Sequence, residues 1–157
     1  MLHDLFTQPT KHRLTRPDEI MIGADALEAR RASEWLEAVC QQGGVPRPEF
    51  ERLALCLEEV LANIIQHGGE TALSQPIRVA FEVAPLEGDN AARVTVSDSG
   101  KAFDPSSAPE AKTPTTLEEA LPHGMGLGLI RQCSSSLHYR REAGRNQLTF
   151  GTRWSQG

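Results

Sequence analysis

Apolar residues recur at steps of three and four along residues 53–68, the spacing that places them on one side of an α-helix. Glu59, Asn63 and His67 share the opposite side of this projection, whereas Glu58 lies at the edge of the apolar stripe. Because polar outer faces are the norm for surface helices, this face on its own indicates only a solvated helix. The stripe consists of Phe50, Leu53, Leu57, Val60, Leu61 and Ile64.

The pattern elsewhere predicts a second long helix and several strands. Asp25 is a favourable N-cap for a helix that runs to about Gln42 and ends at Gly43-Gly44. Residues 124–128 lead into a third helix through about residue 137. Alternation predicts an edge strand over 11–22 interrupted at Pro17, a hairpin of 77–83 and 93–97 with a loop at 85–90, and a closing hairpin of 139–142 and 147–154 turned at 144–146. These elements predict an α/β (α+β) two-layer sandwich, with helices on one face of a mixed, mainly antiparallel sheet.

Length and composition bound the class of protein. A chain of 157 residues suits a single domain, 1–157, with a full hydrophobic core. The net charge of −5 and the pI near 5.5 lack the basic footprint of a nucleic-acid-binding protein. No apolar run approaches the ~20 residues of a membrane span, and the N-terminus lacks the apolar core of a secretory signal. The cysteines are far apart without a C-x-x-C pair, which favours reduced thiols over a zinc site and predicts a cytoplasmic protein.

The predicted strand 93–97 leads into Asp98-Ser99-Gly100. Side chains alternate along a strand, so Asp98 shares the face of Val94 and Val96. A carboxylate at the end of an apolar face is costly unless something donates hydrogen bonds to it, and an adenine amino group is one such donor. The alternative is a tight turn in which the Asp98 side chain bonds to the local backbone.

Three glycines at alternate positions, Gly124, Gly126 and Gly128, precede the predicted third helix. Glycines allow close approach to a ligand, and a helix start presents unpaired N–H groups, a combination that suits phosphate. The segment is neither a P-loop nor a convincing Rossmann fingerprint, and a flexible hinge is the alternative. The preceding residues, 104–123, carry four prolines and form a long connection of the kind that often serves as a lid.

Taken in order, these pieces resemble a known family. E-x-x-x-N on a helix, D-x-G after a strand, a variable lid and G-x-G-L-G-L opening a helix resemble the asparagine box and the two glycine boxes of GHKL ATP-binding domains. The short length, the segment LEEVLANIIQHG and the closing GRNQLTF resemble the anti-sigma-factor serine kinases of the RsbW/SpoIIAB type. The resemblance covers residues 14–153 and implies the Bergerat fold of that superfamily.

The resemblance implies roles for single residues. Asn63 would ligate the Mg²⁺ that bridges the ATP phosphates, and Glu59 would act as general base on a substrate serine. Asp98 would accept from the adenine amino group, with Gly100 letting the chain pass close to the base, and Thr149 would help to hold adenine. The complete expected cofactor-binding set is Asn63, His67, Asp98, Gly100, Gly124, Met125, Gly126, Leu127, Gly128 and Thr149.

The sequence departs from the family pattern at two places. Some relatives carry an arginine ahead of the second glycine box that contacts the terminal phosphate, whereas Pro122 and His123 stand here. Donors to that phosphate would then have to come from His67, His123 or Arg131. In the first glycine box, Ala102 replaces the second glycine, which weakens nucleotide binding or reshapes the turn.

The resemblance implies a function and partners. It implies an Mg·ATP-dependent serine protein kinase and anti-sigma factor that phosphorylates a STAS-type anti-anti-sigma partner and binds a sigma factor, with a homodimer as a further expectation. One alternative is a non-catalytic, nucleotide-gated partner-binding module, and another is the catalytic domain of a split histidine kinase. A structural protein that needs no nucleotide is the remaining alternative.

Overall fold

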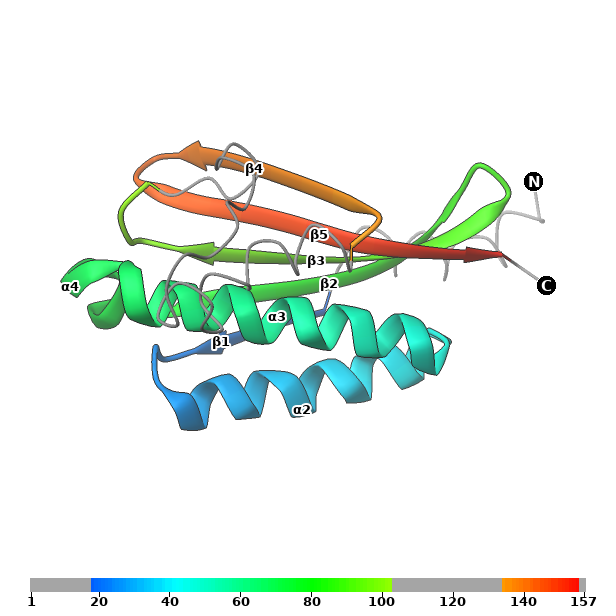
Figure 1. Cartoon of the computed structure of the whole chain (residues 1–157), viewed down its shortest axis with the longest axis horizontal. Helices are drawn as coiled ribbons and strands as arrows, with labels where there is room; N and C mark the ends of the chain where they lie inside the picture. The colour runs from blue at the N-terminus through cyan, green and yellow to red at the C-terminus, as the bar shows by residue number, and fades with distance from the viewer. Residues whose placement is uncertain (1–17, 103–133, 156–157) are drawn as a thin grey trace, which may run out of the picture.

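The structure is a computed structural model that describes residues 18–102 and 134–155. Its elements, in chain order, are β1 (Asp18–Ile22), α2 (Ala26–Gln42), α3 (Arg47–His67), α4 (Gly69–Ser74), β2 (Ile77–Leu86), β3 (Asp89–Asp98), β4 (Ser136–Glu142) and β5 (Arg145–Ser155). The strands form one sheet in the order β1-β2-β3-β5-β4, and the long helices α2 and α3 cover one of its faces (Figure 1). The predicted two-layer sandwich is confirmed, and every strand pair of the described sheet is antiparallel rather than mixed.

The two long helices begin where local chemistry favours it. Asp25 is the N-cap of α2, as predicted, and its carboxylate accepts from the backbone N–H of Glu28 at 2.9 Å. Helix α3 begins earlier than its apolar period alone indicates, because Pro46 precedes it and Pro48 lies in its first turn, where no backbone N–H is needed. Its predicted stripe is confirmed, with Leu53 and Leu57 fully buried under the sheet.

The β2–β3 hairpin is tighter than the predicted loop at 85–90. Its strands pair as far as Leu86 and Asp89, so Glu87 and Gly88 alone form the turn. Both turn residues have positive φ, 51° and 91°, as a two-residue hairpin of the primed type requires. The predicted loop began at Pro85, but this proline lies beyond the part of β2 that pairs with β1, so its missing N–H costs no bond to β1 and the strand continues through it.

The closing hairpin also turns earlier than predicted. Ala143 and Gly144 form its turn, with φ of 52° and 76°, and Glu142 pairs with Arg145. Arg145 and Asn146 therefore belong to β5 and not to the turn predicted at 144–146. Since side chains alternate along a strand, Asn146 shares the face of Leu148.

Two other boundaries differ from the predictions. The chain does not stop its helical path at Gly68-Gly69, because the short helix α4 follows α3 directly. The third helix was expected to reach residue 137, but β4 begins at Ser136 and pairs with β5 from there. The remainder of that helix, the residues 11–17 of the expected edge strand and the expected lid at 104–123 lie outside the described residues.

The core lies between the two helices and the sheet, around Phe150, Leu36 and Leu61. Cys40 and Cys56 are buried and form no disulfide with each other, and burial raises the pKa of the Cys40 thiol to about 12. Across residues 18–102 and 134–155, no helix combines the length and apolar character needed to cross a membrane.

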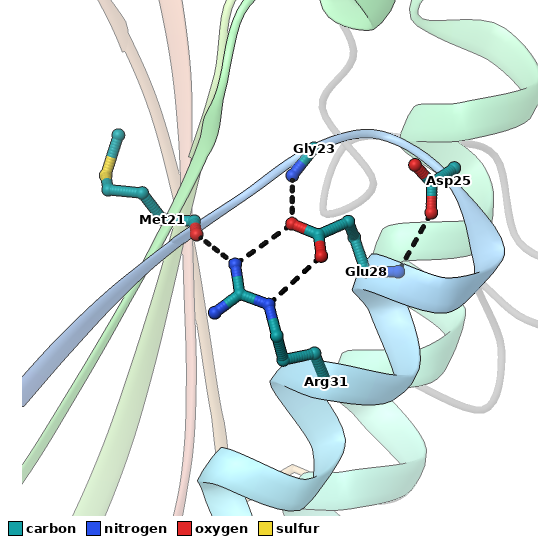
Figure 2. A network of polar contacts seen from close by, with 5 residues as sticks. All are labelled: Met21, Gly23, Asp25, Glu28 and Arg31. Atoms are coloured by element: carbon teal, nitrogen blue, oxygen red, sulfur yellow. Dashed lines mark hydrogen bonds and ion pairs between the residues drawn. The ribbon is translucent and has the colours of Figure 1, made fainter.

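A network of ionic and hydrogen-bonding groups joins β1 to α2 (Figure 2). The Glu28 carboxylate accepts from the backbone N–H of Gly23 at 3.0 Å and pairs with the Arg31 guanidinium at 2.9 Å. Arg31 in turn donates to the carbonyl oxygen of Met21 at 2.7 Å. The Arg31 side chain first, and the Gly23 N–H second, lower the pKa of Glu28 to about 2.

Glu28→Gln is therefore expected to flatten the acid dependence of stability. A carboxyl whose pKa is depressed in the folded state stabilises the fold above its unfolded pKa near 4.5 and loses that contribution as the pH falls towards 2. Urea unfolding at several pH values checks this, with the exposed Glu34→Gln on the same helix as control. Equal slopes for wild type and Glu28→Gln between pH 4.5 and 2 would contradict the expectation.

One buried hydroxyl of the described core has no partner: Thr152 is 3% exposed, and its Oγ1 makes no hydrogen bond. Thr152→Val keeps the side-chain shape and removes the desolvated hydroxyl, so it is expected to raise the free energy of unfolding by about 1 kcal/mol. Thermal unfolding should show a midpoint higher by about 2–4 °C. Thr149→Val is the matched control, because the Thr149 hydroxyl is bonded to that of Thr95 at 2.9 Å and its removal should destabilise.

Candidate functional site

A pocket opens between the C-terminal part of α3 and the helix-facing side of the sheet, close to the end of β3. In Figure 1, β3 ends on the same side of the molecule as α4. The pocket brings together residues from α3, three strands and the loop after β3. Its lining residues are Val60, Asn63, Ile64, His67, Gly68, Val96, Asp98, Lys101, Tyr139, Asn146 and Leu148.

Much of the pocket wall is apolar. Val60 and Ile64 come from α3, while Val96, Leu148 and Tyr139 come from the facing strands. Helical spacing turns the first pair towards the sheet, and the period of two turns the strand residues towards the helix. An apolar wall with a few polar groups is the usual form of a small-molecule site and suits the faces of a planar ring.

Asp98 is the carboxylate of this pocket. It is the last residue of β3 and is 5% exposed, on the face of Val96 as predicted. Its Oδ1 accepts from the backbone N–H of Gly100 at 2.7 Å and from Nδ2 of Asn146 at 3.2 Å. The local-turn interpretation is therefore confirmed, and because the side chain also lines the pocket, its role as acceptor for an adenine amino group stays a prediction. Within the described residues its hydrogen bonds end on Oδ1, which leaves Oδ2 for a ligand.

Asn63 is the second polar group that points to a ligand. It lines the pocket and is 7% exposed. The helical projection placed it on the polar side, yet it is buried, as is Cys56 about two turns earlier. Among the described residues the buried side-chain atom without a partner belongs to Thr152, so Asn63 carries no such penalty, and its carboxamide is a polar group that the pocket offers to a ligand.

Glu59 lies one turn before Asn63 and is not equivalent to its neighbour Glu58, as predicted, although the projection placed Glu58 rather than Glu59 beside the apolar stripe. Glu59 is half-buried, whereas Glu58 is exposed. Partial burial, and secondarily the charge of Glu58, raise the pKa of the Glu59 carboxyl above its ordinary value. A raised pKa favours proton uptake, which suits a general base. Glu59 is not a lining residue of the pocket.

Gly100 allows a close approach between two segments of the protein itself, rather than between the chain and a ligand. A Cβ at Gly100 would lie 2.9 Å from both the Cα and the carbonyl oxygen of Gly68, at the end of α3. The Lys101 N–H also donates to that carbonyl at 3.2 Å, so the loop after β3 packs directly on the helix end. His67 and Lys101 are exposed and line the pocket beside this contact, which places two basic side chains at its edge. Lys101 was not among the expected site residues.

The structure does not bring Thr149 to the pocket. Thr149 pairs with Thr95 on β3 and points to the sheet face away from the helices, where the two hydroxyls bond. Its even-numbered neighbours on β5, Asn146 and Leu148, occupy the pocket side. The expectation that Thr149 helps to hold adenine is therefore corrected, and the physical reason is the period of two along the strand.

The loop after β3 is held by residues that the sequence did not single out. Asn146 donates to the Lys101 carbonyl at 2.7 Å, and Arg141 donates to the Gly100 carbonyl at 3.0 Å. From the other sheet face, Arg145 donates to the hydroxyl and carbonyl of Ser97 at 3.1 and 3.0 Å, and to the Ser99 hydroxyl at 2.6 Å. Gly144 is the sequence signal that could have placed the turn one residue earlier, and with it these residues on β5 and β4.

The expected anion cradle cannot be placed in this pocket, because Gly124, Met125, Gly126, Leu127 and Gly128 lie outside the described residues. The same holds for His123 and Arg131. In the described part of the chain, no three His, Cys, Asp or Glu side chains gather as a metal site would require. A single buried carboxamide oxygen still fits Mg²⁺, which keeps several waters and takes few protein ligands.

Comparisons with known proteins agree with this architecture. The model of the histidine kinase-like ATPase domain matches residues 22–152, and that description implies ATP binding. The serine/threonine-protein kinase BtrW of Bordetella bronchiseptica is 28% identical over 136 residues, which cover 87% of this chain and 93% of BtrW.

Two solved structures share the fold at low sequence identity. A crystal structure of the RsbU and RsbW domains of a Mycobacterium tuberculosis protein matches with a TM-score of 0.63 and 22% identity, covering 90% of this chain and 33% of that longer chain. The SiaB–SiaC complex from Pseudomonas aeruginosa matches with a TM-score of 0.51 and 15% identity, over 96% of this chain and 97% of that one. The similarity extends over nearly the whole of this chain in both cases.

Proposed function

The chain belongs to the family of histidine kinase-like ATPase domains, and from this premise we propose that it is an Mg·ATP-dependent serine protein kinase and anti-sigma factor. Its substrate is a STAS-type anti-anti-sigma protein, and it also binds a sigma factor, so that phosphorylation controls which partner it holds. Similarity to the serine/threonine kinase BtrW supports the kinase part. The structural likeness to a protein solved as a complex, SiaB with SiaC, is consistent with a protein partner.

The observation that carries the proposal is one pocket that sets two polar groups against an apolar wall. The hydrogen bonds of Asp98 to described residues end on Oδ1, which leaves Oδ2 for a ligand, and the Asn63 carboxamide lines the same pocket. A nucleotide satisfies both, since it offers an amino group on a planar base and a cation-bound phosphate chain.

The apolar wall fits the base. Val60 and Ile64 on one side and Val96 and Leu148 on the other bury the faces of a purine ring. The carboxylate of Asp98, an acceptor only, takes the amino group of adenine and is mismatched with the 6-oxo group of guanine. The base therefore determines both affinity and the preference for ATP.

Asn63 and Glu59 act at the phosphate end. The Asn63 carboxamide oxygen is the protein ligand that would hold Mg²⁺, whose role when bound is to neutralise the phosphate charge and orient the chain. Glu59, one helical turn away, accepts the proton of the substrate serine hydroxyl while the serine oxygen bonds to the γ-phosphorus. The bond from that phosphorus to the β–γ bridging oxygen breaks, and ADP leaves.

The test is a transfer assay with γ-labelled ATP, Mg²⁺ and the candidate STAS protein encoded nearest to this chain. Label on the STAS protein that is stable to acid and maps to a serine supports the proposal. ATP binding without transfer would favour a nucleotide-gated binding module, which the Pro122-His123 pair in place of an arginine also favours. Acid-labile phosphohistidine on the partner would instead identify half of a split histidine kinase.

A further inference from the structure

Asn146 is the residue of β5 that pairs with Asp98 of β3, and its side chain is 6% exposed on the pocket side of the sheet. We infer that Asn146 is a positioning residue for nucleotide selection: its carboxamide keeps Asp98 a hydrogen-bond acceptor towards the base. The inference rests on the proposed function and adds a specificity-determining residue to it. Neither the helix nor the glycine boxes supply this group, because it comes from the last strand.

The orientation of the Asn146 carboxamide is decided by its neighbours on β4. Its Oδ1 accepts from the Tyr139 hydroxyl at 2.5 Å and from Nη1 of Arg141 at 2.9 Å. A guanidinium has donors and no acceptor, so the amide oxygen must face Arg141. The amide nitrogen consequently faces the other way, towards Asp98 Oδ1 at 3.2 Å and the Lys101 carbonyl at 2.7 Å.

This orientation determines how Asp98 can meet a ligand. With donors from Asn146 and from the Gly100 N–H, Oδ1 of Asp98 is occupied by two hydrogen bonds. The ionised carboxylate then presents Oδ2, which accepts and cannot donate. An amide turned the other way would set its oxygen against the Asp98 carboxylate and the Lys101 carbonyl. That arrangement would favour a proton on Asp98 and so convert the acceptor into a donor.

The donor to Asp98 is the distinct contribution of Asn146, because the loop has other supports. Arg141 holds the Gly100 carbonyl at 3.0 Å, and Arg145 holds Ser97 and Ser99 from the opposite sheet face. Replacing the amide nitrogen of Asn146 by oxygen therefore changes the hydrogen bonding of Asp98 while these contacts keep the path of the loop. The isosteric Asn146→Asp is the substitution that does this.

The experiment compares affinities for ATP and for inosine 5′-triphosphate, which has an oxo group in place of the 6-amino group. Wild type should prefer ATP by at least about a hundredfold, because an acceptor facing an acceptor is penalised. In Asn146→Asp, two adjacent carboxyls share a proton, so Asp98 can donate to the oxo group. The preference should then fall to within about tenfold. Gln147→Glu, the same amide-to-acid change on the other sheet face, should leave the preference unchanged.

Each outcome bears on the inference. An equal loss of affinity for both nucleotides in Asn146→Asp, with the preference intact, would overturn it and leave Asn146 a structural residue. Tyr139→Phe removes one donor that orients the amide and keeps the ring, so it should lower the preference severalfold; it decides the matter if Asn146→Asp does not fold. Wild type that binds neither nucleotide removes the proposed function along with the inference. Wild-type ATP binding with an unaltered preference in both variants removes the inference alone.

Discussion

Glu59→Gln is expected to abolish phosphate transfer while leaving ATP binding in place. The substitution keeps the size of the side chain but removes the carboxylate that takes the serine proton, so the rate of transfer should fall by about 10²–10⁴-fold. Because Glu59 does not line the pocket, the dissociation constant for Mg·ATP should stay within about twofold. Single-turnover transfer and calorimetric binding, measured on the same preparation, separate the two quantities.

Glu58→Gln is the matched control for this prediction, since it changes the adjacent carboxylate on the exposed side of α3. Transfer should persist in this variant, with an altered pH dependence. A base works when ionised, so the rate should rise with pH through the raised pKa of Glu59. Removing the Glu58 charge takes away one cause of that raised pKa and should move the acid limb of the profile to lower pH. Equal activity of Glu59→Gln and wild type would remove Glu59 from the mechanism.

Asn63→Leu is expected to stabilise the protein alone and to remove its response to Mg·ATP. Asn63 is 7% exposed and lines the pocket with Val60 and Ile64, so an apolar side chain of similar volume in its place adds buried apolar surface. The nucleotide-free variant should therefore melt at a higher temperature than wild type. Adding Mg·ATP should raise the midpoint of wild type and leave the variant unchanged, because a ligand stabilises only the state that binds it.

The opposite signs of these two effects are what make the Asn63 test informative. A residue kept for packing loses stability when it is replaced, whereas a residue kept for a ligand can cost stability and still be retained. Ile64→Val, the next residue and a conservative change in the same pocket, is the control and should lower stability slightly without abolishing the Mg·ATP response. A less stable Asn63→Leu that still responds fully to Mg·ATP would contradict the role assigned to Asn63.

The elements with a strong and unbroken period could be predicted from the sequence. The stripe of α3 spans about four turns, and its burial agrees with the projection, while Cys56 and Asn63 on the other side of the projection are buried as well. The face of Asp98 followed from alternation with Val96. Both predictions depend only on local backbone geometry, which is determined by residues a few positions apart in the sequence.

The positions that could not be predicted depend on where a turn lies. Placing the last turn at 144–146 put Asn146 in the turn, whereas the expectation for Thr149 came from the family resemblance. The structure turns at Ala143-Gly144, so Asn146 lies in the strand and faces the pocket. The positive φ at Ala143 is uncommon for a residue with a Cβ, so composition did not indicate it. Thr149 lies in the predicted strand but on the sheet face away from the pocket, because side chains alternate between the two faces.

Long-range contacts were equally invisible in the sequence. Nothing local to Arg145 shows that its guanidinium reaches Ser97 and Ser99, 48 and 46 residues earlier. Nothing local to Gly100 shows that it packs on Gly68 rather than on a ligand. Such pairs can be predicted only once the strand register is known. They hold the loop after β3, which carries the groups proposed to recognise the base.

The most direct test of the central claim, that the pocket between α3 and the strand ends binds Mg·ATP, is a calorimetric titration of the wild-type chain with ATP in excess Mg²⁺. A saturable isotherm for one site is expected, with an affinity at least about a hundredfold lower in Asp98→Ala, which lacks the acceptor for the amino group. A flat isotherm at millimolar ATP, or the same affinity in wild type and Asp98→Ala, would contradict it.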